Sequence, residues 1–190
     1  LDLNSNNNVK QMWLDSLAIQ TRFLSQNLEY HLLGNHLFVN AKALVFAGLF
    51  YKGEEAGHWY RLGISIINRE LSEQVLSDGG NFELSPMYHA IFLEDLLDLV
   101  NVHQAYDRSL PDNLENKIVQ MLEWLKVMCH PDKEIAFFND SALGIAPSFV
   151  ELLSYADRLG IVFKAHKVNR LIHLEESGYI RVEDENMVII

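Results

Sequence analysis

Three short segments of the sequence concentrate side chains that can move a proton or hold an anion. They are Gly34-Asn35-His36, the run from Phe82 to His89, and Phe138-Asn139-Asp140-Ser141. Histidine, tyrosine and carboxyl side chains are the usual general acids and bases of enzymes. Each segment stands before or at the start of a predicted helix, where free backbone N–H groups favour an anion by about 0.3–1 kcal/mol. Together the segments predict a site that could bind an anionic ligand.

The predicted helices explain why these segments should meet. Hydrophobic periodicity predicts helices over Val9–Leu33, His36–Tyr51, Glu54–Ser77, Met87–Tyr106, Pro111–Cys129 and Phe149–Leu159, with a long loop only at His130–Ser148. Short connections favour antiparallel neighbours. If successive helices run up and down, those that start near His36, Met87 and Phe149 run in the same direction. Their N-termini would then share one pole of the domain.

The distribution of apolar residues predicts the fold class. His36–Tyr51 and Met87–Tyr106 are apolar around most of their circumference, whereas Glu54–Ser77 keeps a polar face. The tryptophans on helical faces are core candidates: Trp13, Trp59 and Trp124. Buried and half-exposed helices alternate, as in stacked helical hairpins. We expect a mainly α fold, with antiparallel helical hairpins of an incomplete α/α toroid and a short β-hairpin or meander at the C-terminus.

The two ends of the sequence differ in character. Leu171–Glu175, Tyr179–Glu183 and Met187–Ile190 are predicted strands separated by turns. Two or three strands are a poor structure alone, so we expect them to open a larger β-domain from which this chain is cut. Residues 1–8 are predicted to be a disordered or linker edge. Asp2–Asn8 is polar and Asn-rich, and it lacks the basic and then apolar order of a signal peptide.

Composition excludes several classes of protein. The 190 residues carry 15 Lys and Arg against 26 Asp and Glu, a formal charge of −11, which argues against nucleic acid as the main partner. The single cysteine, Cys129, excludes an internal disulfide and a zinc site of paired thiolates. No apolar run approaches the length of a membrane span. Phosphate-loop, HExxH and GxSxG patterns are absent, and no cofactor or metal is implied.

The three segments carry a family resemblance. Gly34-Asn35-His36-Leu37 running into Asn40–Leu44, Asp78–His89 and Phe138–Ser141, in this order, resemble the central region of the heparinase II/III-like polysaccharide lyases. The closing Ser177–Val182 strengthens the resemblance, which covers roughly residues 33 to 190. It implies a partial α/α-toroid domain over residues 9–168 and the first strands of a truncated β-sandwich domain over residues 169–190. In that family the active site lies between the two domains.

The resemblance also implies roles for individual residues. The family's chemistry is β-elimination on uronic-acid polysaccharides, in which the substrate carboxylate must be neutralised while a proton leaves C5. By resemblance, Asn35 with His36 neutralises the carboxylate, and Tyr88 acts as base or acid at C5 and the leaving O4. Glu83, His89 and Asn139 are the predicted substrate-binding residues.

Each of these residues also has a purely structural interpretation. Asn35 could be only an N-cap, Tyr88 and His89 could be interface packing, and Glu83 could complete a cap. Asn139 with Asp140 could form a structural turn.

The resemblance leaves two functional classes open. In the first, the full-length protein is a lyase on an anionic, glycosaminoglycan- or alginate-like polysaccharide, with a periplasmic or secreted location. The family's other catalytic His and Tyr come from the β-domain, so we expect this fragment to be inactive alone. In the second, the chain is a non-catalytic helical scaffold, or a degenerate lyase, that binds polysaccharide or a protein partner. The absence of a Lys/Arg cluster argues against a strongly sulfated substrate.

Overall fold

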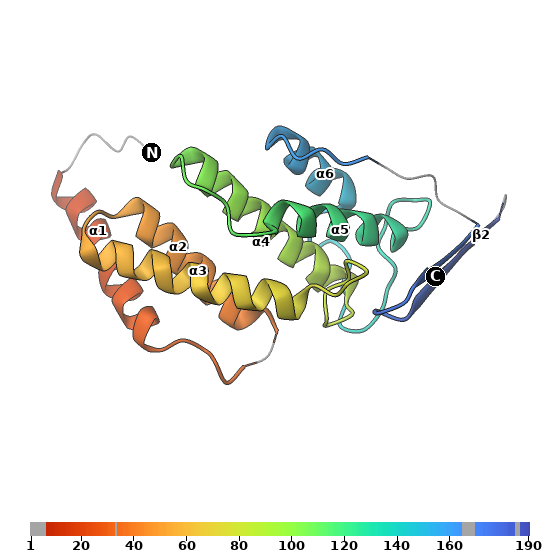
Figure 1. Cartoon of the computed structure of the whole chain (residues 1–190), viewed down its shortest axis with the longest axis horizontal. Coiled ribbons are helices and arrows are strands. Elements are labelled where there is room, and N and C mark those ends of the chain that lie inside the picture. The colour runs from red at the N-terminus through yellow and green to blue at the C-terminus, as the bar shows by residue number, and fades with distance from the viewer. Residues whose placement is uncertain (1–6, 33, 165–169, 185–186) are drawn as a thin grey trace. The chain divides into compact units, whose positions relative to one another are not determined.

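The computed structural model describes residues 7–32, 34–164, 170–184 and 187–190. In these residues six helices come first and three strands follow (Figure 1). The chain divides into two compact units, one that ends at Ile67 and one that starts at Asn68.

The first unit is a set of closely packed helices. It contains α1 (Asn7–Gln26), α2 (Asn35–Phe50) and the part of α3 (Glu54–Gln74) up to Ile67. Its core combines buried residues of α2 and α3 with partly buried residues of α1: Leu44, Ala47, Ala56, Trp59, Ala18 and Leu24. A Cβ atom at Gly63 would lie 2.7 Å from the Ala41 carbonyl oxygen. Glycine at this position therefore allows α3 to pack directly against the backbone of α2.

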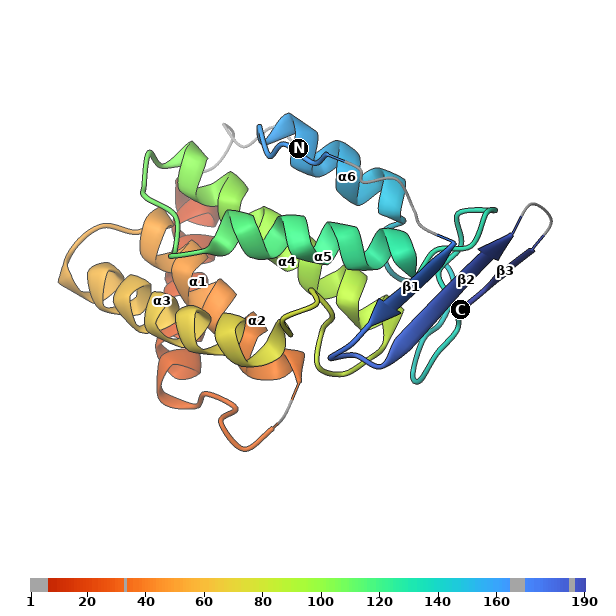
Figure 2. The ribbon, with the colours of Figure 1, turned by 45° about the vertical axis from the view of Figure 1, so that its right-hand side comes forward.

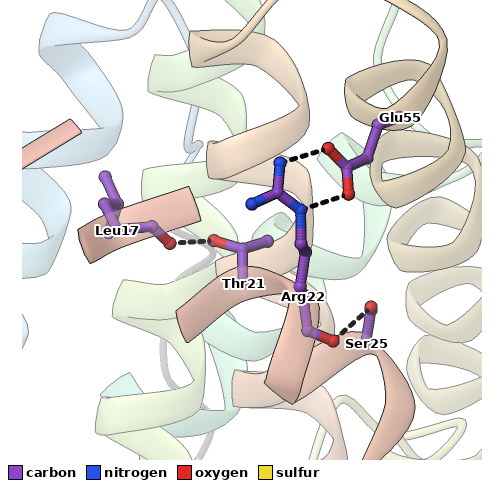
Figure 3. A network of polar contacts seen from close by, with 5 residues as sticks. All are labelled: Leu17, Thr21, Arg22, Ser25 and Glu55. Carbon is purple, nitrogen blue, oxygen red and sulfur yellow. Dashed lines mark hydrogen bonds and ion pairs between the residues drawn. The ribbon is translucent and has the colours of Figure 1, made fainter. Parts of the chain in front are cut away.

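An exposed ion pair joins α1 to α3 (Figure 3). Arg22 Nε and Nη2 donate to the two carboxylate oxygens of Glu55 at 2.6 and 2.7 Å. The hydrogen bonds lower the pKa of Glu55 and raise the pKa of Arg22. Nearby, the hydroxyls of Thr21 and Ser25 donate to carbonyls of α1 itself. Since both side chains of the pair are about half exposed, solvent screens the interaction and its contribution to stability is small.

The second unit is built on a buried central helix. It contains α4 (Pro86–Ala105), α5 (Leu114–Val127) and α6 (Phe149–Arg158), and α4 buries residues such as Phe92, Leu93 and Leu96 almost completely. The Tyr155 hydroxyl donates to Asp98 and accepts from Asn101, and Gln104 donates to the Leu159 carbonyl. These pairs advance together along both helices, so α4 and α6 run in the same direction, as predicted.

Three strands form an antiparallel meander at the end of α5 (Figure 2). They are β1 (Leu171–Leu174), β2 (Tyr179–Asp184) and β3 (Met187–Ile189), with Leu171 opposite Val182 and Val182 opposite Ile189. The inner face packs on Trp124, Met128 and Ala136. The outer face exposes four apolar side chains, each between 44 and 63% exposed: Leu171, Ile180, Val182 and Ile189.

A buried arginine attaches this sheet to α5. Arg181 of β2 is only 6% exposed, and its Nη1 donates to the carbonyls of Val127 and Cys129 at 2.8 and 2.6 Å. A cation at the C-terminus of a helix satisfies free carbonyl groups and complements the helix dipole. The strands therefore belong to the same compact unit as α4, α5 and α6.

The predicted fold class is confirmed: the chain is mainly helical and ends in a β-meander. Helix α1 ends at Gln26 rather than Leu33, and Leu33 lies outside the described residues. Trp13 is 54% exposed, so its prediction as a core residue is wrong. Only the face of α1 that carries Ala18 and Leu24 packs on the core. Trp13 belongs to the apolar residues of α1 that lie outside this face and stay exposed.

The predicted domain limits are only partly within the described residues. Residues 1–6 and the predicted boundary between residues 168 and 169 lie outside them, whereas Asn7 and Asn8 are already helical. Among the helices that the structure describes, none has the length and apolar character to cross a membrane.

Candidate active site

The first turn of α4 carries Tyr88 and is fixed by two buried serines. Ser85 is the N-cap of α4, and its Oγ accepts from the Tyr88 N–H at 3.4 Å. Ser141 Oγ lies 3.1 Å from Ser85 Oγ and accepts from the Met87 N–H at 3.3 Å. Pro86 occupies the first helical position, where its missing N–H costs nothing. The Tyr88 ring is half-buried, and its hydroxyl makes no hydrogen bond to any residue that the structure describes.

His89, the next residue, lies in the interior. Its ring has no exposed surface and stacks on Trp124, with centroids 4.4 Å apart. Nδ1 accepts from the Asn81 N–H at 3.2 Å, so Nε2 carries the proton and donates to the Met121 carbonyl at 3.0 Å. Burial lowers the pKa of His89 to about 3, which keeps the ring neutral near pH 7. With both nitrogens occupied, His89 supports the loop before α4 and has no atom exposed to a substrate.

The turn before α4 is tied to the turn between β1 and β2. Asp78 Oδ1 accepts from the Gly80 N–H at 3.0 Å, and Oδ2 accepts from the N–H and hydroxyl of Ser177 at 2.7 and 2.8 Å. Ser177 Oγ accepts in turn from Trp124 Nε1 at 2.9 Å. A Cβ atom at Gly80 would lie 2.8 Å from this indole nitrogen. The network therefore requires glycine there and joins the sheet, α5 and the turn before α4.

Asn139 also holds the loop before α4, through a hydrogen bond to its backbone. It lies between α5 and α6 with φ of 51°, and its Nδ2 donates to the Leu84 carbonyl at 2.6 Å and to the Tyr179 hydroxyl at 3.4 Å. Glu83 is half-buried beside Leu84, and its N–H donates to Asn81 Oδ1 at 3.0 Å. The structure thus brings Asn139 to the loop that carries Glu83, and it uses the Asn139 amide to hold a backbone carbonyl.

Asn35 and His36 belong to the first unit. Gly34, not Asn35, is the N-cap of α2, so Asn35 is the first helical residue and does not cap the helix. The Asn35 side chain is half-buried and makes no hydrogen bond within the described part of the chain. His36 is exposed, with Nδ1 3.7 Å from Glu29 Oε2, which also accepts from Asn40 at 3.0 Å. Asn35 and His36 therefore stand at the start of α2 as Tyr88 stands at the start of α4.

A groove of the second unit lies away from these residues. It has a volume of about 910 Å³ and runs between α6 and the loop before it, with Glu94, Tyr155 and Arg158 among its lining residues. No predicted site residue lines it. Within residues 7–32, 34–164, 170–184 and 187–190, no group of three or more His, Cys, Asp or Glu side chains could hold a metal ion.

Comparison with known sequences identifies the family. The sequence profile described as Heparinase II/III N-terminus matches residues 4–159. The chain belongs to the heparinase II/III family. All six predicted site residues lie inside the matched range of this heparinase II/III chain, whereas β1, β2 and β3 lie after it.

Curated relatives of this heparinase II/III chain are longer bacterial lyases. It is 31% identical over 148 residues to the heparin-sulfate lyase of Bacteroides stercoris, a match that covers 70% of this chain and 22% of that protein. It is 32% identical over 136 residues to the heparin-sulfate lyase of Pedobacter heparinus, covering 68% of this chain and 20% of that protein. The chain thus spans about a fifth of the length of these relatives.

Solved structures share the fold. The crystal structure of heparinase III matches with a TM-score of 0.78 at 21% identity, covering 95% of this chain and 32% of that one. The heparan sulfate lyase HepC of Pedobacter heparinus matches with a TM-score of 0.69 at 24% identity, covering 90% and 29%. The helices and the terminal sheet of this chain therefore follow the fold of the heparinases, as expected for a partial α/α toroid.

Several residues that build the site were not among the predicted ones. Ser141, Ser177 and Tyr179 lie in segments that resemble the family, but the sequence predicts no site role for them. Their hydrogen-bond partners lie 40 to 99 residues away in sequence, as in the pairs Tyr179–Asn139 and Ser177–Asp78. The one local signal was the Gly79-Gly80 pair, because adjacent glycines often mark a close approach of another chain segment.

Proposed function

We propose that the full-length protein containing this chain is a polysaccharide lyase that cleaves a uronic-acid-containing glycosaminoglycan by β-elimination. Membership of the heparinase II/III family and the names of its relatives, heparin-sulfate lyases, support this class of activity. The assignment of the site rests on the contrast between Tyr88 and its neighbours. Its neighbours Ser85, Met87 and His89 are buried and hydrogen-bonded, whereas its own hydroxyl is left without a hydrogen bond in the described structure.

Tyr88 is the proposed proton-transfer residue. Abstraction of the C5 proton places charge on the neighbouring carboxylate, the electron pair forms the C4–C5 double bond, and the C4–O4 bond breaks. The leaving oxygen takes a proton. Tyr88 serves as base at C5 or as acid at O4, work for which a positioned side chain typically contributes a factor of about 10²–10⁴. The rigid first turn of α4 supports this role, because proton transfer needs a fixed distance to the reacting atom.

Asn35, with His36 beside it, is the proposed partner of the substrate carboxylate. A fixed hydrogen-bond donor aimed at a developing negative charge typically contributes about 3–4 kcal/mol. The Asn35 amide is half-buried and makes no hydrogen bond within the described residues, so it is available as a donor. Glu83 is a proposed substrate contact. His89 and Asn139 instead form hydrogen bonds that hold the backbone of the loop before Tyr88.

The sheet supports a domain that continues the chain. Its outer face exposes Leu171, Ile180, Val182 and Ile189, while its inner face already packs on Trp124. A contiguous exposed apolar patch often marks a surface that another part of a protein covers. The proposed cover is a further layer of a β-sandwich in the same protein, which would supply the remaining catalytic groups. The 190 residues alone are then inactive, and a polymeric substrate points to a periplasmic or secreted location.

The test is an activity assay on the full-length protein. It is incubated with heparan sulfate, hyaluronan, chondroitin and alginate, and the ultraviolet absorbance of the unsaturated uronate is followed. Tyr88→Phe should lower kcat by at least about 10²-fold. Tyr106→Phe, which changes an exposed tyrosine at the other end of α4, should leave kcat unchanged.

Three results would contradict the proposal in different ways. Full activity of Tyr88→Phe would place the chemistry on another residue. Turnover by the 190-residue chain would disprove the need for a second domain. Binding to one of the four polymers, with no unsaturated uronate formed from any of them, would favour the non-catalytic scaffold.

A further inference from the structure

Two side chains hold the Leu84 carbonyl in the loop before α4. It accepts the Tyr179 hydroxyl at 2.7 Å and the Asn139 amide at 2.6 Å, and these two side chains are themselves 3.4 Å apart. Leu84 has φ of 57°, in the left-handed region that a leucine rarely adopts. Such a conformation persists only where surrounding contacts hold it.

The anchored carbonyl leads directly to Tyr88. Leu84 is bonded to Ser85, whose hydroxyl caps α4 by accepting from the Tyr88 N–H. A rotation of the Leu84–Ser85 peptide would move the cap and, with it, the first turn of α4. The two side chains on the Leu84 carbonyl therefore act on the residue proposed to transfer the proton, although neither bonds to Tyr88.

Tyr179 is well suited to hold this carbonyl. It lies on the inner face of β2, with its ring 4.9 Å from the ring of Phe138 and 5.9 Å from that of Trp124. Burial raises the pKa of Tyr179, although the hydrogen bond from Asn139 opposes this, so the hydroxyl stays a donor near pH 7. The packed ring fixes the direction in which that donor points.

We infer that Tyr179 and Asn139 are positioning residues for Tyr88, which hold the left-handed Leu84 and so set the start of α4. This inference rests on the proposed function. It assigns the first β-hairpin a part in the site, because β2 presents the hydroxyl that fixes a loop of the helical region. The position of Tyr88 then depends on the position of the sheet, because Tyr179 of the sheet holds the Leu84 carbonyl.

Tyr179→Phe in the full-length protein is the direct test. The variant keeps the ring packing and removes only the hydroxyl, so kcat should fall about tenfold to a hundredfold, with KM within about twofold. Tyr155→Phe is the matched control, since it also removes a hydroxyl with two hydrogen bonds, to Asp98 and Asn101. The control should lose a similar amount of thermal stability and keep the kcat of the unmodified protein.

Asn139→Gly gives a second and independent readout. Glycine retains the left-handed backbone at this position and removes the amide. If Asn139 acts as a brace, the variant should lower kcat with little change in KM. A rise in KM at constant kcat would instead show direct substrate binding and overturn the positioning role.

The remaining outcomes separate this inference from the proposed function. Loss of activity in Tyr88→Phe with normal kcat in Tyr179→Phe would overturn the inference alone. Equal losses of kcat in Tyr179→Phe and Tyr155→Phe would reduce the effect to stability, which also overturns it. Full activity in Tyr88→Phe would overturn both.

Discussion

His89, one of two buried histidines of α4, makes the stability of this protein depend on pH. Burial lowers the pKa of His89 to about 3 in the folded state, against an ordinary value of 6.5. Between these values the unfolded chain binds a proton that the folded chain does not, so stability falls as the pH falls. The loss begins near pH 6.5, where the unfolded chain starts to bind the proton. From there to pH 5 the free energy of unfolding falls by about 1.36 kcal/mol per pH unit, so His89 lowers it by about 2 kcal/mol between pH 7 and pH 5.

Urea unfolding of the 190-residue chain at pH 7, 6 and 5 measures this loss. His89→Gln keeps a group that can accept from Asn81 and donate to Met121, and it should remove about 2 kcal/mol of the fall between pH 7 and pH 5. His58→Gln, which removes an exposed imidazole from α3, controls for the loss of one histidine. A pH dependence equal in the parent chain and in His89→Gln would refute the reasoning. So would an NMR titration in which the His89 ring gains a proton between pH 6 and 7 while the chain stays folded.

Two further changes test the packing of each unit. Ser177→Ala should cost about 1–3 kcal/mol of unfolding free energy by urea titration, because it leaves the buried Trp124 indole N–H without an acceptor; an unchanged midpoint would contradict the importance of that bond. Gly63→Ala should cost about 1–3 kcal/mol, because its Cβ would lie 2.7 Å from the Ala41 carbonyl oxygen. Gly57→Ala on the same helix meets only a flexible guanidinium at 3.2 Å, and it should be neutral or stabilising by up to about 1 kcal/mol. Equal effects of the two alanines would argue against the close approach of α2 and α3.

The helices were predictable because their signals are local. Ser85 and Pro86 mark the start of α4 in the sequence, and the structure has its N-cap and first helical residue at these positions. The end of α1 was not predictable from periodicity, since Leu28 and Leu32 continue the apolar pattern. There the Asn27 side chain donates to the Phe23 carbonyl, and the backbone leaves the helix after Gln26.

The site was predictable as a set of segments but not as a set of contacts. That the loops before α4 and α6 share a pole followed from helix direction, and Ser141 does meet Ser85. The role of His89 did not follow, because nothing local distinguishes a buried imidazole from an exposed one at a helix start. The bond from Tyr179 to the Leu84 carbonyl joins residues 95 positions apart, and such a pair leaves no periodic trace.

The three tryptophans give this chain its own optical probes. Trp59 is 3% exposed in the core of the first unit, and Trp124 is 1% exposed at the junction of α5 with the sheet, whereas Trp13 is 54% exposed. In a Trp13→Phe variant, the emission of the other two shifts to longer wavelength only as each core opens to water. Replacing one of these two by phenylalanine then assigns the remaining signal to a single unit. Fluorescence alone can thus show whether the two units melt in one step or in two.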